Sequence, residues 1–270
     1  MKLFLGMARG LKAMHQYRVK PGKGGAAERE AAKVRQTAGA ADRDASRQAK
    51  GKGRASDKLQ DDEEEEAGAP LMDDEVTASQ AGIPAGEVRA YAHRDIKPAN
   101  IMIADDGETP VLMDLGSLAP SPVEVNSRSL AIAVQEQAAE HSTMPYRAPE
   151  LFDVKTETVI DTKTDIWSVG CTLYACLVGK SPFEARSDET GGSLSMCVLS
   201  GDWRFPGDAK GGKGKAAQNS DVGDGISESV KEIVRRCLKV EPSERPDVDE
   251  LIDMIETIVD ELPDEGALDI

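Results

Sequence analysis

The stretch "YAHRDIKPANIMI" at residues 91–103 places an acid, a cation and an amide at short, fixed spacing. Transfer of a phosphoryl group from ATP requires a protein to align a hydroxyl, neutralise phosphate charge and hold a magnesium ion. Asp95 is suited to orient the hydroxyl, Lys97 to meet the γ-phosphate, and Asn100 to bind the metal. A second carboxylate, Asp114, follows in "MDLG", and amide and carboxylate oxygens are the ligands that a hard cation prefers.

Each of these residues is ambiguous by itself, because a lone Asp in a loop is usually a turn former or a helix cap, and a lone Lys is usually solvated. Their joint spacing is more specific. The eight-residue "HRDIKPAN" is followed by two short apolar runs around the turn "DDGETP", then by Asp-Leu-Gly, and then by "APE" at 148–150. This order of motifs is typical of protein kinases.

From about Tyr91 to Leu262 the chain resembles the C-terminal lobe of a eukaryotic protein kinase. The motifs that carry the resemblance are "YAHRDIKPANIMI", "PVLMDLGS", "YRAPELF" and "TDIWSVGCTLYACLVGKSPF". Within that superfamily it is similar to the Numb-associated kinase group, nearest the lipid-anchored Ser/Thr kinases of the Golgi and vacuole. The resemblance implies an α+β, protein-kinase-like fold, made mainly of the α-helical C-lobe with a short β-hairpin and a disordered insertion. It also implies ATP and Mg²⁺ as cofactors and proteins with Ser or Thr hydroxyls as substrates.

The resemblance assigns further roles around the same loop. Thr143 of "TMPYRAPE" would bond Asp95 and Lys97, which favours Ser/Thr over Tyr substrates. Met102 would form part of the floor under adenine. The implied catalytic residues are Asp95, Lys97 and Thr143, the implied metal ligands are Asn100 and Asp114, and the implied ATP-binding residues are Lys97, Asn100, Met102 and Asp114.

Five residues are implied as structural support. Glu150 of "APE" would pair with Arg245 of "SERP"; an exposed pair would contribute only about 0–1 kcal/mol, whereas the resemblance implies a buried one. Asp165 would hold the backbone around His93 and Arg94 from a buried helix. Arg94 could also meet a phosphate on the activation segment.

Apolar periodicity places Leu3, Met7, Leu11 and Met14 on one stripe, so residues 3–16 are predicted to form an amphipathic helix. The following stretch has almost no aromatics and no sustained apolar period, and it turns from basic to acidic at "DDEEEE". The predicted organisation is a helix at 1–17, a disordered insertion at 18–88, the C-lobe at 89–263 and an acidic tail at 264–270.

Within the lobe, a hairpin is predicted from the apolar runs Ile101–Ile103 and Val111–Met113. Helices are predicted at 127–141, at 164–178, in "SESVKEIVRRCLKV" and in "DVDELIDMIETIVDEL". The last opens with Asp247 and Glu250 at capping-box spacing. A Gly- and Lys-rich loop is predicted at 207–225.

Composition limits the partners. The net charge of −16 argues against a nucleic-acid partner, since phosphate binding needs a positive surface. The four cysteines form no CxxC pair and have no nearby His at metal spacing, which disfavours zinc and favours a cytoplasmic protein with free thiols. No apolar run is long enough to cross a bilayer. Peripheral Golgi or vacuolar membrane association is implied by the resemblance alone.

A kinase also needs a Gly-rich loop over the phosphates, a strand lysine and its glutamate partner. The 270 residues contain no GxGxxG and no VAIK-like strand, and the helix at 3–16 resembles the one that directly precedes the catalytic loop. We therefore expect the N-lobe to be missing, the 270-residue chain alone to have little or no kinase activity, and an exposed apolar upper face to favour a partner.

Three hypotheses follow for the function. The first is a Ser/Thr protein kinase whose upstream portion is absent from this sequence. The second is a non-catalytic kinase-like interaction module, and the third is a truncated lobe that regulates or competes with a full-length relative. The complete set Asp95, Lys97, Asn100 and Asp114 favours the first, and the absent lobe favours the others.

Overall fold

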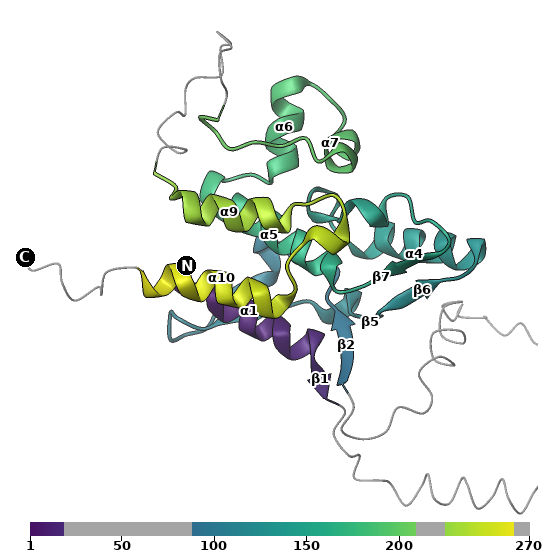
Figure 1. Ribbon diagram of the computed structural model, residues 1–270, viewed down its shortest axis with the longest axis horizontal. Helices are drawn as coiled ribbons and strands as arrows, with labels where there is room; N and C mark the ends of the chain where they lie inside the picture. Colours follow the sequence, from purple (N-terminus) through teal and green to yellow (C-terminus); the bar gives the residue numbers. More distant parts are fainter. Residues whose placement is uncertain (19–87, 209–224, 262–270) are drawn as a thin grey trace, which may run out of the picture. The chain divides into compact units, whose positions relative to one another are not determined.

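The structure is a computed structural model that describes residues 1–18, 88–208 and 225–261. The predicted insertion, most of the predicted loop at 207–225 and the predicted tail at 264–270 lie outside these ranges. Residues 1–17 and the described residues from 88 to 261 form one unit although they are far apart in sequence (Figure 1). The ends of the predicted insertion are described: Arg18 lies in strand β1 and Val88 in strand β2.

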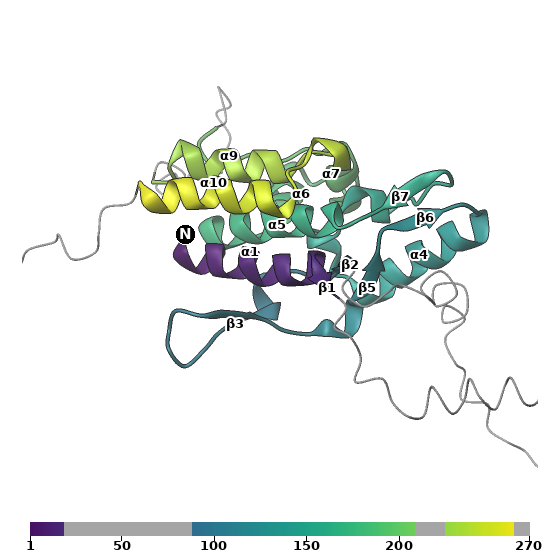
Figure 2. The same cartoon turned by 60° about the horizontal axis from the view of Figure 1, so that its bottom comes forward.

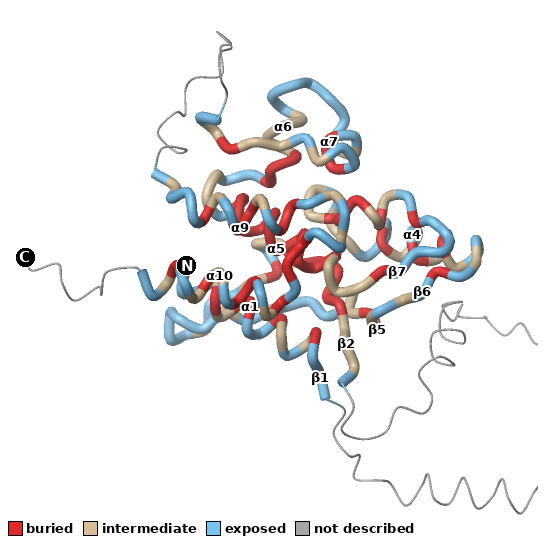
Figure 3. Tube along the Cα trace, viewed as in Figure 1, coloured by how far each residue is buried: buried red, intermediate tan, exposed pale blue. Residues whose placement is uncertain are grey.

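The central element is α5 (Lys163–Val178), which is buried along most of its length (Figure 3). It packs against α9 (Glu228–Cys237). Trp167 of α5 stacks on Phe183 with ring centroids 5.2 Å apart. The helix ends at Gly179, whose φ of 91° suits a residue without a Cβ. The predicted buried helix and its glycine stop are confirmed.

The first helix, α1 (Lys2–His15), lies alongside α10 (Val248–Asp260) (Figure 2). Its buried face differs from the predicted stripe. The helix contacts α10, the strand β4 (Pro110–Leu112) and the strand β2 (Val88–Ala92), and so it buries a wider face. Leu3 is 42% exposed. The buried residues of α1 are Leu5, Met7, Ala8, Leu11 and His15. The predicted capping box of α10 is present.

The strands are short. β1 (Tyr17–Arg18), β2 (Val88–Ala92) and β5 (Ala119–Ser121) form one sheet in the order β1-β2-β5. The predicted hairpin is confirmed as β3 (Ile101–Ile103) paired antiparallel with β4. A third pair joins β6 (Val123–Val125) to β7 (Thr158–Ile160).

The predicted helix at 127–141 is confirmed as α4 (Arg128–His141), capped by Ser127, whose side chain accepts from the N–H of Leu130. It packs with β6 and β7 over a small core separate from the main one. That core consists of Val125, Ala131, Val134, Ala138, Leu151, Val154 and Ile160.

The remaining elements are short helices. They are α6 (Pro182–Thr190), α7 (Leu194–Ser200) and the 3₁₀ turns η2 (Pro98–Asn100), η3 (Leu115–Ser117), η4 (Met144–Tyr146), η5 (Pro149–Leu151) and η6 (Pro242–Glu244). The described part of the chain is thus mainly helical with a few short strands, as the sequence predicted.

Candidate active site

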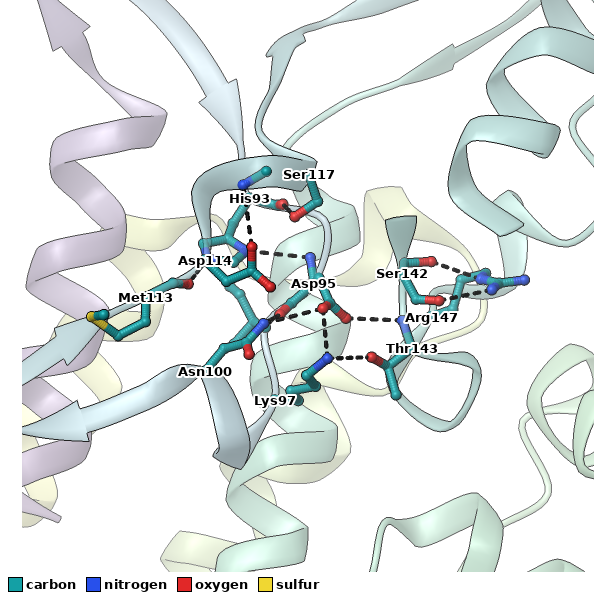
Figure 4. Close-up of polar contacts among 12 residues, drawn as sticks. His93, Asp95, Lys97, Asn100, Met113, Asp114, Ser117, Ser142, Thr143 and Arg147 are labelled. Carbon is teal, nitrogen blue, oxygen red and sulfur yellow. Dashed lines mark hydrogen bonds and ion pairs between the residues drawn. The ribbon is translucent and has the colours of Figure 1, made fainter. Parts of the chain in front are cut away.

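The loop between β2 and η2 gathers the predicted polar side chains around Asp95 (Figure 4). Lys97 donates from Nζ to Asp95 Oδ2 and to Thr143 Oγ1, each at 2.7 Å. The backbone N–H of Thr143 donates to Asp95 Oδ1 at 2.9 Å. Asn100 donates from Nδ2 to the Asp95 backbone oxygen at 2.8 Å and to Asp95 Oδ2 at 3.1 Å. Four residues that the sequence predicted to act together therefore form one hydrogen-bonded cluster.

The cluster sets the charge of Asp95. Burial by itself raises the pKa of this carboxyl, since its side chain is only 8% exposed. The hydrogen bonds from Lys97 and Thr143 outweigh burial and hold the pKa of Asp95 below its usual range. Asp95 is therefore ionised at neutral pH and can accept a hydrogen bond from a hydroxyl.

Asp165 fixes the backbone of the same loop from the first turn of α5. Its carboxylate is fully buried and accepts the N–H groups of His93 and Arg94, each at 2.7 Å. Arg94 has a φ of 67°, a left-handed conformation that costs a non-glycine residue on the order of 1–3 kcal/mol. The two hydrogen bonds to Asp165 help to offset that cost, which is the contact predicted from the sequence.

The structure adds one residue to this arrangement that sequence reasoning missed. His15, at the end of α1, is buried and donates from Nε2 to Asp165 Oδ2 at 2.9 Å. It ties the first helix to the loop through a shared carboxylate. No sequence signal singles it out, because the two residues are 150 positions apart.

One candidate metal ligand, Asp114, lies between two contacts that His93 makes. Its Nε2 donates to the Met113 carbonyl at 3.0 Å, and its own carbonyl accepts from Ser117 Oγ at 2.6 Å. Asp114 stands between these two anchors in a left-handed conformation with φ of 59°. Its carboxylate accepts from the N–H of Gly116 at 3.4 Å and is exposed, so most of its lone pairs are available.

The oxygen atoms of Asn100 and Asp114 are suitable ligands for Mg²⁺. Asn100 uses its NH₂ group within the loop, which leaves its Oδ1 available as a cation ligand, as is the exposed Asp114 carboxylate. Within the described ranges, no group of three or more His, Cys, Asp or Glu side chains forms a metal cluster. Two oxygen ligands are enough for Mg²⁺, which usually keeps several waters and binds substrate phosphates.

The other predicted site residues lie around this cluster. Glu150 and Arg245 form a two-pronged ion pair, with distances of 2.7 and 2.8 Å. The Arg245 side chain is 0% exposed and that of Glu150 is 15% exposed, so the pair is largely buried. Met102 is 55% exposed on the hairpin. Arg94 is buried, and its Nη1 donates to Gln137 Oε1 of α4 at 3.1 Å, whereas its buried Nε has no hydrogen-bond partner among the described residues. A contact of Arg94 with a phosphate on the activation segment stays a prediction.

A family model described as the protein kinase domain matches residues 88–255. That is more than half of the chain, and the chain therefore belongs to the protein kinase family. The predicted fold class is confirmed, whereas the placement within the Numb-associated group stays a prediction.

Relatives named as serine/threonine-protein kinases are similar over much of this chain. ENV7 of Saccharomyces cerevisiae is 33% identical over 189 residues, which are 70% of this chain and 46% of that protein. For ppk13 of Schizosaccharomyces pombe the identity is 40% over 62% of this chain and 44% of that protein. For serine/threonine-protein kinase 16 of Rattus norvegicus it is 34% over 70% of this chain and 56% of that protein.

The chain thus spans about half the length of the curated relatives it matches. Separately, none of the helices in the described ranges combines the length and the apolarity that crossing a membrane requires.

Proposed function

We propose that the chain is part of a serine/threonine protein kinase that transfers the γ-phosphate of ATP to Ser and Thr hydroxyls of proteins. The observation that carries the proposal is the cluster in which Lys97 and Thr143 together hold an ionised Asp95. The side chains of Asn100 and Asp114, which keep oxygen lone pairs available, are drawn around the same loop in Figure 4. The relatives named as serine/threonine-protein kinases support the same choice of acceptor.

Each residue has a role that follows from its position. Asp95 accepts a hydrogen bond from the substrate hydroxyl and orients its oxygen toward the γ-phosphorus. Lys97 has one N–H left after its two hydrogen bonds, and this N–H faces phosphate charge as the bond to the ADP oxygen breaks. Asn100 and Asp114 would hold Mg²⁺, which neutralises phosphate charge when it is bound.

The remaining roles rest on the resemblance and on position. Met102 contributes to the surface under adenine. Arg245 with Glu150, and Asp165 with His93 and Arg94, keep the loop and the activation segment in place. Association with Golgi or vacuolar membranes is a prediction of the resemblance.

The test uses the gene product with a C-terminal tag, purified from its own cells and assayed with Mg²⁺, ATP and a Ser/Thr peptide library. Asp95→Asn and Asp114→Asn should each lower phosphate transfer by at least about 100-fold. Asp106→Asn is the control, because that carboxylate only shapes the exposed hairpin turn. Equal activity of Asp114→Asn and the unchanged protein would overturn the proposal.

The 270-residue polypeptide forms a separate arm of that test. It contains no GxGxxG, so we expect it to transfer little or no phosphate by itself. Robust Mg²⁺-dependent transfer that disappears in Asp114→Asn would show this expectation to be wrong.

A second candidate function is a non-catalytic interaction or regulatory module, and the apolar hairpin favours it. Met102 and Val111 lie directly opposite each other on β3 and β4 and are 55% and 41% exposed. Exposed apolar side chains of this kind are typical of a surface that a partner covers. In that case Asp95→Asn would still complement a deletion of the gene, whereas Met102→Asp combined with Val111→Asp would not.

A further inference from the structure

Arg147 lies next to the cluster on the side away from Lys97, where it contacts the residue that precedes Thr143 (Figure 4). Its Nε donates to Ser142 Oγ at 2.7 Å, and its Nη2 donates to the Ser142 carbonyl at 2.9 Å and to the Ala139 carbonyl at 3.3 Å. All three acceptors belong to the last turn of α4 or to its capping residue.

Helix ends need such partners. The last four carbonyls of a helix have no N–H partner within it, and a cation placed there also interacts favourably with the helix dipole. Arg147 is only 8% exposed, and its guanidinium lies over the Phe152 ring at 5.1 Å from the centroid. The arginine is therefore fixed on one side by an aromatic ring and on the other by the end of α4.

The helix that Arg147 holds is itself anchored. Ala131, Val134 and Ala138 of α4 are buried in the small core shared with β6 and β7. Gln137 accepts from Arg94 of the catalytic loop. The end of α4 is thus a firm support for the residue that follows it.

One peptide group joins this support to the active site. The Ser142 carbonyl accepts from Arg147, and the N–H of the same peptide group, which belongs to Thr143, donates to Asp95 Oδ1. A trans peptide group is planar, and its C=O and N–H point in opposite directions. Fixing the carbonyl oxygen therefore fixes the direction of the N–H that reaches Asp95.

We propose that Arg147 is a positioning residue for Asp95, acting through the peptide group between Ser142 and Thr143. Its hydrogen bonds go to Ser142 and Ala139 rather than to Asp95 itself. The effect of Arg147 on catalysis rests on the proposed function. The contacts that link Arg147 to Asp95 do not, because they are a property of the folded chain.

The test is amide hydrogen exchange measured by NMR on the full 270-residue chain. Arg147→Met should raise the exchange rate of the Thr143 amide by about tenfold to 100-fold, as expected for the loss of a charged hydrogen-bond partner. Exchange in α5 and α10 should stay unchanged. Ser142→Ala should leave the Thr143 amide protected, because it removes the hydroxyl contact and keeps the carbonyl contact.

Two further variants control for the chemistry. Arg204→Met removes an arginine that is paired at the surface with Glu189, and it should leave Thr143 unaffected. Arg147→Lys keeps the charge and replaces the planar fork by one ammonium, so its effect on Thr143 should be intermediate. If Arg147→Met does not fold, the Arg147→Lys chain carries the same test.

Unchanged protection of Thr143 in a folded Arg147 variant would overturn the proposal. So would a rise spread equally over α5 and α10, which would show a purely structural role. Hydrogen exchange needs no phosphate transfer, so the two proposals can fail separately. The expected exchange pattern together with an inactive gene product purified from its own cells would count against the proposed function alone. In an active preparation, the same variant should lower kcat and leave KM for ATP unchanged.

Discussion

Replacing Arg245 by Met tests how much one buried side chain stabilises the domain. All five N–H donors of its guanidinium are used: two bond Glu150, and three bond the carbonyls of Lys163, Lys239 and Val240. The guanidinium also lies 5.0 Å from the centroid of a buried tryptophan ring. The variant removes every one of these contacts and leaves the Glu150 carboxylate without its counter-charge.

The expected loss is large. A hydrogen bond to a charged group contributes about 1.5–3 kcal/mol, so the two bonds to Glu150 amount to about 3–6 kcal/mol. Breaking a buried ion pair from one side costs about 3–5 kcal/mol by an independent argument. We expect Arg245→Met to lower the free energy of unfolding by about 3–5 kcal/mol, the range that both arguments share. A typical domain has a total of about 5–15 kcal/mol.

Urea unfolding followed by tryptophan fluorescence measures the loss, since Trp167 lies beside the altered residue. Arg9→Met is the matched control: its ion pair with Glu256 is exposed on both sides, so its loss should be less than about 1 kcal/mol. Arg245→Lys should lie between the two. If Arg245→Met and Arg9→Met cost the same within about 1 kcal/mol, the argument from burial is wrong.

Lys97→Met removes a hydrogen-bond donor from Asp95, so an NMR titration should find the pKa of Asp95 raised; an unaltered pKa would contradict the account of the cluster. Because folding lowers this pKa, the contribution of Asp95 to stability is present above about pH 3.9 and is lost as the pH falls through the folded-state value. Lys97→Met should diminish that acid-dependent loss, measured by urea unfolding as the pH is lowered from neutral to well below about 3.9. Gly170→Ala would bring a methyl within 2.6 Å of a buried Cβ of α9 and should cost about 1–3 kcal/mol in the same assay. Gly10→Ala, in an open part of α1, should instead stabilise by about 0.5–1 kcal/mol, and the packing argument fails if both changes act alike.

The sequence predicted the elements whose signals are local. The hairpin β3–β4 was readable from two apolar runs around a turn, and α10 from its capping box. The polar cluster around Asp95 could be predicted because Asp95, Lys97 and Asn100 lie at short spacing within one loop. Thr143 was placed by resemblance, since nothing local joins it to residues 46 and 48 positions earlier.

The features of the fold that could not be predicted from the sequence depend on contacts between segments of the chain. Strands β5, β6 and β7 have three residues each, too few for an alternating pattern, and they exist because partners far along the chain supply hydrogen bonds. The contact of His15 with Asp165 is likewise tertiary. The contact of Arg147 with the end of α4 spans only five to eight residues, but it requires the chain to turn back after the helix, and no motif marks that turn. The buried face of α1 differs from the predicted stripe because its width is set by three neighbours, α10, β4 and β2.

The pairing of β1 with β2 has a consequence for how this protein can be re-engineered. Tyr17 and Val88 lie in neighbouring strands of one sheet, and the Tyr17 and Tyr91 rings meet edge to face at 6.0 Å. The described chain therefore stops at the end of β1 and resumes at the start of β2, the strand alongside. A turn of a few residues could bridge these two strands, or a foreign domain could be spliced between them, and α1 would keep its place beside α10 in either case.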